Sequence, residues 1–240
     1  MLTTFAIVLG AVYETLAISI AALYQSRRGE LTLAYGDEKL RLWATRLLSQ
    51  ARIRLQVEGL DRLKTQSPPF VIVSNHQSLY DIPLLFAALP LSLRMAAKKE
   101  LFSTPLWGRA MREAGFVEID RKNRQRAYEA LEQAGLSLKE RQVSLYVAPE
   151  GTRSRTGHLA PFKRGAFELA RAGGLPVLPV AIVGAIEVHR SGSFLVHRGK
   201  NVAVRICKPL LASDFPNYEG LRDAARDTIE QALLADSAPA

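Results

Sequence analysis

The chain has 240 residues, 48% of them hydrophobic, which is enough for one domain with a full-sized core and an additional segment. Its net charge of +9 favours an anionic partner, such as a nucleic acid, an anionic membrane surface or a phosphorylated substrate. The single cysteine, Cys207, excludes an intrachain disulfide and a metal site built from cysteines alone. Cys207 lies in a strand-like run, where we expect a core residue.

The N-terminal residues 2–24 are almost wholly apolar, with Glu14 as their single charge. The run is long enough to span a bilayer, although a carboxylate near its centre is unfavourable in lipid. Arg27 and Arg28 follow it and would hold that end on the cytoplasmic side. We expect a membrane-seated helix, either spanning the bilayer or lying in its interface, in preference to a buried soluble helix.

Residues 37–57 combine leucines, isoleucine and Trp43 with several arginines and a lysine. This pattern predicts a basic amphipathic helix. Two interpretations follow: the helix meets anionic headgroups with Trp43 at the boundary, or it packs on its own domain and keeps a solvated basic face.

Six strand-like runs follow, over residues 70–73, 93–97, 116–119, 144–147, 177–183 and 202–206. Helical patterns lie between several of them, over residues 82–89, 125–138, 165–172 and, at the end, 221–234. This alternation predicts an α/β domain with a largely parallel central sheet flanked by helices. We therefore divide the chain into N-terminal membrane-associating helices, residues 1–56, and a globular domain, residues 57–240. The chain contains no glycine-rich dinucleotide fingerprint and no P-loop.

A polar stretch, residues 75–81, joins the first of these strands to a helix start. The order places His76 at the end of the strand and Asp81 near the N-terminus of the helix, so the carboxylate can fold back onto the imidazole. A carboxylate on one ring nitrogen fixes the tautomer and raises the basicity of the other nitrogen, which can then accept a hydroxyl proton. The alternative is a surface histidine followed by a helix-capping aspartate.

A second stretch follows the strand at residues 144–147. Gly151, Thr152 and Arg153 lie at the strand end, where backbone N–H groups and a guanidinium can bind a phosphate. The alternative is a tight turn with a solvated arginine. Further basic residues follow closely, namely Arg155, Lys163 and Arg164. They favour the anion site.

Four blocks in this order carry a family resemblance. Residues 75–81 read NHQSLYD, residues 98–108 read KKELFSTPLWG and lead to IDR at 119–121, residues 149–154 read PEGTRS and lead to PFKRGA at 161–166, and residues 178–181 read LPVA. The chain resembles the glycerolipid acyltransferase family, whose best-known members are the 1-acyl-glycerol-3-phosphate acyltransferases. The resemblance covers roughly residues 57–209. Ala148 and Glu118 depart from the family pattern, which bears on the pocket lining and the acceptor lipid.

The resemblance implies an enzyme of phospholipid biosynthesis. It would transfer a fatty acyl group from acyl-CoA or acyl-carrier protein to the sn-2 hydroxyl of 1-acyl-glycerol-3-phosphate, giving phosphatidic acid. His76 would remove the hydroxyl proton and Asp81 would orient His76, so that the alkoxide attacks the thioester directly. A nucleophilic Ser78 would instead give a covalent intermediate, and we favour this alternative less. Thioester transfer requires no metal, and we expect no cofactor beyond the acyl donor.

The resemblance also implies an acceptor-phosphate site made of Glu150, Gly151, Thr152 and Arg153, with Arg153 as the main cation. A glutamate is not an obvious phosphate ligand, so we expect Glu150 to orient Arg153 or a backbone N–H group.

Lys99 and Arg121 are expected to assist this site. Only one of Lys98 and Lys99 can face the site from a strand, and we choose Lys99. Three histidines lie outside the blocks and are predicted to be surface residues: His158, His189 and His197.

The expected location is the cytoplasmic membrane, with the active site on its cytoplasmic face. The expected partners are a lysophospholipid acceptor, the acyl donor and an anionic membrane surface, and no nucleic acid, because no nucleic-acid-binding motif accompanies the basic residues. Two alternatives stay open: an acyltransferase for another lysolipid, such as lyso-ornithine lipid, and a non-catalytic protein that binds anionic lipid.

Overall fold

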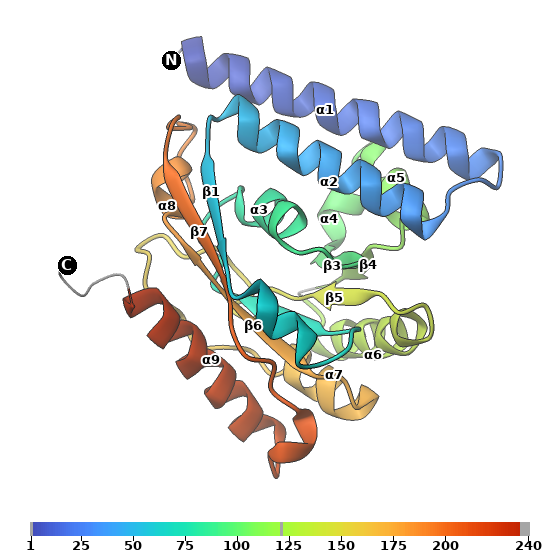
Figure 1. The fold of residues 1–240 in the computed structure, drawn as a ribbon. Coiled ribbons are helices and arrows are strands. Elements are labelled where there is room, and N and C mark those ends of the chain that lie inside the picture. Colours follow the sequence, from blue (N-terminus) through green and yellow to red (C-terminus); the bar gives the residue numbers. More distant parts are fainter. Residues whose placement is uncertain (1, 121, 236–240) are drawn as a thin grey trace.

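The computed structural model describes residues 2–120 and 122–235. Figure 1 shows the described elements in chain order: α1 (Leu2–Arg27), α2 (Leu33–Gln50), β1 (Arg54–Glu58), the 3₁₀ helix η1 (Leu60–Lys64), β2 (Val71–Ser74), α3 (Asp81–Ala88), β3 (Leu93–Lys98), α4 (Lys99–Phe102), α5 (Trp107–Glu113), β4 (Val117–Ile119), α6 (Arg124–Glu140), β5 (Ser144–Tyr146), α7 (Gly165–Gly173), β6 (Val177–Val183), α8 (Ala185–Val188), β7 (Asn201–Ile206), the 3₁₀ helix η2 (Ala212–Asp214) and α9 (Tyr218–Leu234).

The described strands form one sheet in the order β1-β7-β6-β2-β5-β3-β4. Every neighbouring pair is parallel except β6 and β7, which are antiparallel. The predicted α/β class with a largely parallel sheet is therefore confirmed. Strands β2 to β6 all run in one direction, so the loops that follow them meet at one edge of the sheet. In parallel sheets, this edge is the usual place for a ligand site.

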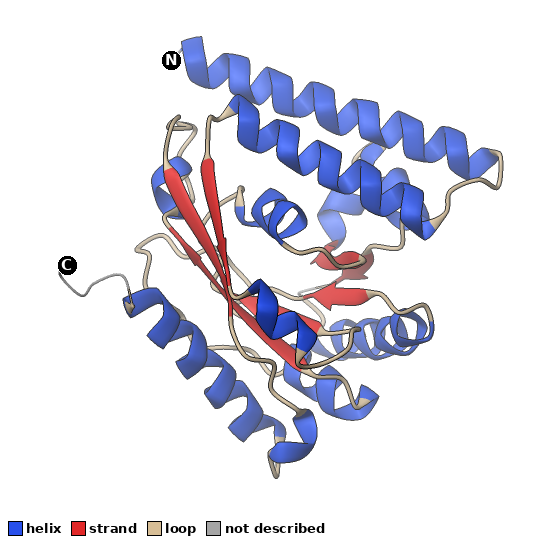
Figure 2. Ribbon diagram, in the orientation of Figure 1, coloured by secondary structure: helices blue, strands red, loops and turns tan. Residues whose placement is uncertain are grey.

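Helices cover both faces of the sheet (Figure 2). One apolar core includes side chains of α2 and α3, and the other includes side chains of α6, α7 and α9. Strand β2 contributes to both, because Ile72 belongs to the first core while Val71 and Val73 belong to the second. A strand buried on both faces has no polar side to present, which is why this stretch is continuously apolar in the sequence.

The helix predicted over residues 37–57 ends earlier than expected. Helix α2 stops at Gln50, Arg52 adopts a left-handed φ of 51°, and the chain continues as β1. Ile53, Leu55 and Val57 suit a helix face, but they also alternate with polar residues at the period of a strand. Pairing with β7 decides between the two. The predicted boundary between residues 56 and 57 falls within β1.

Helix α2 packs on its own domain. Ala44, Leu47 and Leu48 are buried, whereas Arg41 and Arg46 remain exposed. The interpretation of a packed helix with a solvated basic face is therefore confirmed.

The N-terminal helix α1 lies along the outside of α2 and α5 (Figure 1). By length and composition, it is the one described helix that could cross a membrane. Its inward face carries polar contacts: Glu14 Oε2 lies 3.0 Å from Arg46 Nη1, and the Trp43 ring N–H donates to Thr15 Oγ1 at 3.2 Å. Its outward face is an apolar stripe that consists of Phe5, Val8, Leu9, Val12, Tyr13, Leu16, Ile20 and Tyr24.

A buried ion pair fastens α2 to the sheet. The Arg94 side chain, in β3, is only 3% exposed, and its Nη1 lies 2.6 Å from Asp37 Oδ1 in α2. Arg94 also donates to the carbonyl oxygens of Leu93 and Ala114, so one guanidinium joins α2, β3 and the end of α5. A buried cation of this kind is stable only while its counter-charge is present.

We therefore predict that Asp37→Ala lowers the free energy of unfolding by about 3 kcal/mol, because the buried guanidinium loses its counter-charge. Denaturant unfolding followed by circular dichroism measures this change. Glu38→Ala is the matched control, since Glu38 is the next residue and pairs only at the surface with Lys39; its effect should stay within about 0.5 kcal/mol. Equal effects of the two substitutions would contradict the anchoring role of Arg94.

Candidate active site

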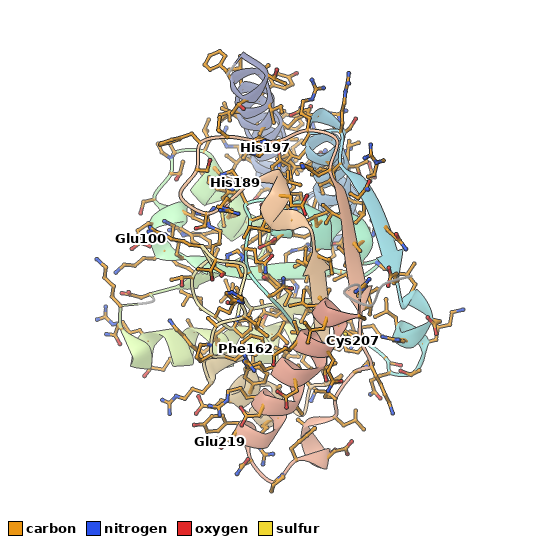
Figure 3. The ribbon with its side chains drawn as sticks, turned by 90° about the vertical axis from the view of Figure 1, so that its left-hand side faces the viewer. Glu100, Phe162, His189, His197, Cys207 and Glu219 are labelled. Carbon is orange, nitrogen blue, oxygen red and sulfur yellow. The ribbon has the colours of Figure 1, made fainter. Side chains whose placement is uncertain are left out.

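The loops after β2 and β5 bring most of the predicted site residues to one edge of the sheet, where the connection after β6 adds His189. His76 follows β2, Glu150 and Arg153 follow β5, and His189 follows β6 through the short helix α8. Strand β2 lies between β5 and β6, so the loop that carries His76 is central. Figure 3 labels His189 and His197 at the end of the molecule where α1 lies.

His76 and Asp81 form the predicted pair. The ring Nδ1 of His76 lies 2.8 Å from Asp81 Oδ2. The same oxygen accepts the backbone N–H groups of Gln77 at 2.7 Å and Ser78 at 2.9 Å. Because Oδ2 acts as an acceptor for all three, Nδ1 carries the ring proton and Nε2 is left as the basic nitrogen. Asp81 is the fully buried first residue of α3, where the positive end of the helix dipole favours a carboxylate.

Asn75 fixes the start of this loop. Its side-chain amide donates to the Ile182 carbonyl oxygen at 2.8 Å and its side-chain oxygen accepts the Ile182 N–H at 2.8 Å. The side chain thus pairs with the β6 backbone as another strand residue would, and it is 1% exposed. The positioning role of Asn75 cannot be recognised from the sequence, because its partner lies 107 residues away.

Glu150 holds the backbone of two loops. Its Oε1 accepts the His76 N–H at 2.6 Å, and its Oε2 accepts the Ala160 N–H at 2.9 Å. Burial raises the pKa of Glu150, and these N–H groups oppose the shift. The expected role of Glu150 is to orient either Arg153 or a backbone N–H group, and the structure shows contacts with backbone N–H groups. Both oxygens are engaged, so the carboxylate does not need to face a phosphate.

Gly151 and Arg153 form the rest of this loop. Gly151 has a φ of +76°, and a Cβ there would lie 2.5 Å from Lys163 Nζ, so the lysine side chain packs directly over the glycine. Nη1 of Arg153 is buried and has no hydrogen-bond partner among the described residues. Thr152 is exposed. A free guanidinium N–H and a lysine on one tight loop are a suitable environment for an anion.

The second block places Lys99 beside an acidic partner. Lys99 begins α4 and its Nζ lies 2.6 Å from Asp120 Oδ2, which raises the pKa of Lys99 through the hydrogen bond and lowers that of Asp120. The charge of Lys99 is therefore already paired, at the end of β4. Lys98 ends β3. Arg121 lies outside the described residues.

One of the three outlying histidines is not a surface residue. His158 and His197 are exposed, as predicted, but His189 is 5% exposed. Its Nε2 lies 3.0 Å from the Ser193 carbonyl oxygen, and its Nδ1 is buried with no partner in the described part of the chain. Burial lowers the pKa of His189, and the Arg153 guanidinium lowers it further. His189 is thus a buried imidazole whose neutral form is favoured, in the connection that follows β6.

Two further expectations concern Cys207 and Ser78. Cys207 is buried, which confirms the predicted core position, and burial raises the pKa of its thiol. Ser78 is fully buried and its Oγ accepts the Tyr80 N–H at 3.2 Å. The Nδ1 nitrogen of His76 already contacts Asp81 Oδ2, so it does not serve as a base for the Ser78 hydroxyl.

A buried carboxylate contacts a histidine at the carboxyl edge of the parallel sheet, beside a loop that carries Arg153 and Lys163. Comparison with known proteins gives the class. A sequence model of the acyltransferase family matches residues 54–183, and the chain belongs to this family.

Individual relatives agree with one another. A 1-acyl-sn-glycerol-3-phosphate acyltransferase of Saccharomyces cerevisiae is 30% identical over 93% of this chain and 77% of its own length. A chloroplastic enzyme of that name from Brassica napus is 33% identical over 80% of this chain, but the match spans only 54% of the plant protein. The crystal structure of the 1-acyl-sn-glycerophosphate acyltransferase PlsC from Thermotoga maritima aligns over the whole chain and 96% of that structure, with a TM-score of 0.85 and 27% identity.

We predict that burial of His189 makes the free energy of unfolding depend on pH, with lower stability in acid. The folded pKa of His189 lies below the ordinary 6.5, so the unfolded chain binds the proton more readily. The stabilisation is present above about pH 6.5 and is lost as the pH falls toward the folded pKa. His189→Gln should therefore show a smaller loss of unfolding free energy between about pH 7.5 and about pH 5.5 than the unsubstituted protein. His197→Gln, at an exposed histidine, should keep the full loss; an unchanged pH dependence in His189→Gln would contradict the prediction.

Proposed function

We propose that this protein transfers a fatty acyl group from an acyl thioester to the sn-2 hydroxyl of 1-acyl-glycerol-3-phosphate, giving phosphatidic acid. The observation that carries the proposal is the 2.8 Å contact between His76 Nδ1 and Asp81 Oδ2, which leaves Nε2 basic. The names of the relatives support this acceptor. The donor is acyl-CoA or acyl-carrier protein. In either case the thiolate of CoA or of the carrier protein is the leaving group.

The reaction begins with proton removal by His76. Nε2 takes the proton of the sn-2 hydroxyl while the hydroxyl oxygen attacks the thioester carbonyl carbon. Asp81 stabilises the imidazolium that forms, through the hydrogen bond already present at Nδ1. The tetrahedral intermediate then breaks its C–S bond, and the leaving thiolate recovers the proton from Nε2. Direct attack needs no acyl-enzyme, so Ser78 has no covalent role in this scheme.

The loop after β5 holds the acceptor's phosphate in this proposal. Arg153 supplies a buried guanidinium N–H with no partner among the described residues, and Lys163 adds a second positive charge over Gly151. The loop is tied to the base, because the Ser154 N–H donates to the His76 carbonyl oxygen at 2.7 Å. A phosphate fixed on this loop therefore has a defined position relative to His76, as a near-attack geometry requires.

The site is proposed to work at the cytoplasmic face of the membrane, with α1 lying in the interface. Apart from Glu14 and a few hydroxyl groups, helix α1 is apolar on nearly all sides, which is typical of a helix that is covered by protein or lipid all round. Its inward face is covered by α2 and α5, so the outward stripe defined above is left for lipid. Glu14 and Thr15 of α1 contact Arg46 and Trp43 of α2. These contacts favour a helix that lies along the domain in the membrane interface over a helix that crosses the bilayer alone.

We predict that His76→Ala or Asp81→Asn lowers kcat by at least about a hundredfold, because the first removes the base and the second its orienting charge. Formation of phosphatidic acid from labelled acyl-CoA and detergent-dispersed lysophosphatidic acid measures this loss. His158→Ala is the matched control, since His158 is exposed in a neighbouring loop, and it should keep full activity. If His76→Ala retains product formation, a non-catalytic lipid-binding role is the better explanation.

A panel of lysolipids tests the acceptor. Lysophosphatidic acid should be the preferred substrate, and Arg153→Gln should raise its KM about tenfold or more through the loss of a charge-assisted hydrogen bond. Arg141→Gln, exposed at the end of α6, should leave KM unchanged. A product from lyso-ornithine lipid with none from lysophosphatidic acid would assign the protein to the alternative acceptor.

A further inference from the structure

The segment that joins α8 to β7, residues 189–200, carries the most exposed large apolar side chain of the described residues. Phe194 is 93% exposed, and the neighbouring Leu195 is 46% exposed. A phenylalanine ring held this far out has almost no contact with its own domain, and nearly half of the adjacent Leu195 is exposed as well. A segment of this kind points to a partner that covers it.

The surroundings of Phe194 are basic. Residues 189–201 contain Arg190, Arg198 and Lys200 and no aspartate or glutamate. The start of β1 adds two arginines, because Arg54 donates to the Gly199 carbonyl oxygen at 2.8 Å and Arg52 lies just before it in the exposed turn. Lys200 pairs with Glu187 at 3.5 Å, which leaves the arginines as the cations of this surface. An exposed apolar tip with arginines in its own segment and in the adjoining strand matches the headgroup boundary of an anionic membrane, where the ring enters the apolar layer and the guanidinium groups stay among phosphates.

The segment continues the apolar stripe of α1. The Val196 N–H donates to Thr4 Oγ1, and Thr4 Oγ1 in turn lies near the Val196 carbonyl oxygen, both at 3.4 Å. These contacts place Phe194 next to the first turns of α1, where Phe5 is also exposed. Figure 1 shows the α8–β7 connection below the N-terminal end of α1, and Figure 3 places His197 there.

We propose that Phe194 and Leu195 form a second point of contact with an anionic membrane, with Arg190, Arg198 and Arg52 on its phosphate groups. The proposal rests on the membrane location given under the proposed function. With α1, this tip would set the orientation of the domain on the bilayer. The same segment begins at the buried His189, which follows β6 and α8 at the edge of the sheet where the candidate phosphate site lies.

Single-cysteine labelling of the full chain tests the contact. Cys207, the one native thiol, is buried and its pKa is raised, which keeps its background labelling low. A polarity-sensitive dye on Phe194→Cys should brighten and shift to the blue with phosphatidylglycerol vesicles, and nitroxide-labelled lipid should quench it. The matched control is Leu234→Cys on α9, an exposed apolar position that should show neither change.

A dye on Tyr13→Cys, in the α1 stripe, separates the possible failures. If the Tyr13 dye enters lipid and the Phe194 dye stays in water, the proposal is overturned while the membrane location stands. If neither dye enters lipid, both the contact and the membrane location are wrong, and acyl transfer to detergent-dispersed lysophosphatidic acid still tests the chemistry separately.

The charges of the tip provide an independent readout. Arg190→Gln combined with Arg198→Gln should weaken partitioning onto phosphatidylglycerol vesicles by about fivefold for each arginine at low salt, with no change on phosphatidylcholine vesicles. Arg141→Gln, exposed at the end of α6, is the control for a lost surface charge. Partitioning of the double variant equal to that of the control would overturn the proposal.

Discussion

Oδ2 of Asp81 accepts three hydrogen bonds, from the ring of His76 and from the backbone of Gln77 and Ser78, and this convergence determines the shape of the site. One oxygen closes the turn between β2 and α3 and selects the tautomer of the base. The turn and the chemistry therefore cannot be changed separately. A residue without a carboxylate at position 81 would free the imidazole and also open the backbone that carries it.

The loops around this turn are joined by the same means. Glu150 accepts the His76 N–H, Ser154 donates to the His76 carbonyl oxygen, and Asn75 binds the backbone of β6. His76 and the loop after β5 thus form one hydrogen-bonded unit with the backbone of β6. In the proposed phosphate site, the glutamate therefore holds the backbone, and the cationic side chains are left for the anion.

Much of this was accessible from the sequence because it is local. The order of strand, polar loop and helix places His76 and Asp81 within five residues of each other, and the apolar runs identify six of the seven described strands. The missed features depend on distant partners. Strand β1 forms because it pairs with β7, and the role of Asn75 depends on a partner 107 residues away. The burial of His189 depends on how its own loop folds. Periodicity carries no information about such contacts.

The outward stripe of α1 has a consequence for the protein in water. Eight large apolar side chains in one row along a helix exceed what monomers in solution usually leave uncovered. Once extracted from lipid, the chain would bury that row against detergent tails or against a second molecule. The oligomeric state of a purified sample would then depend on the detergent or lipid that is present rather than on a specific interface between subunits.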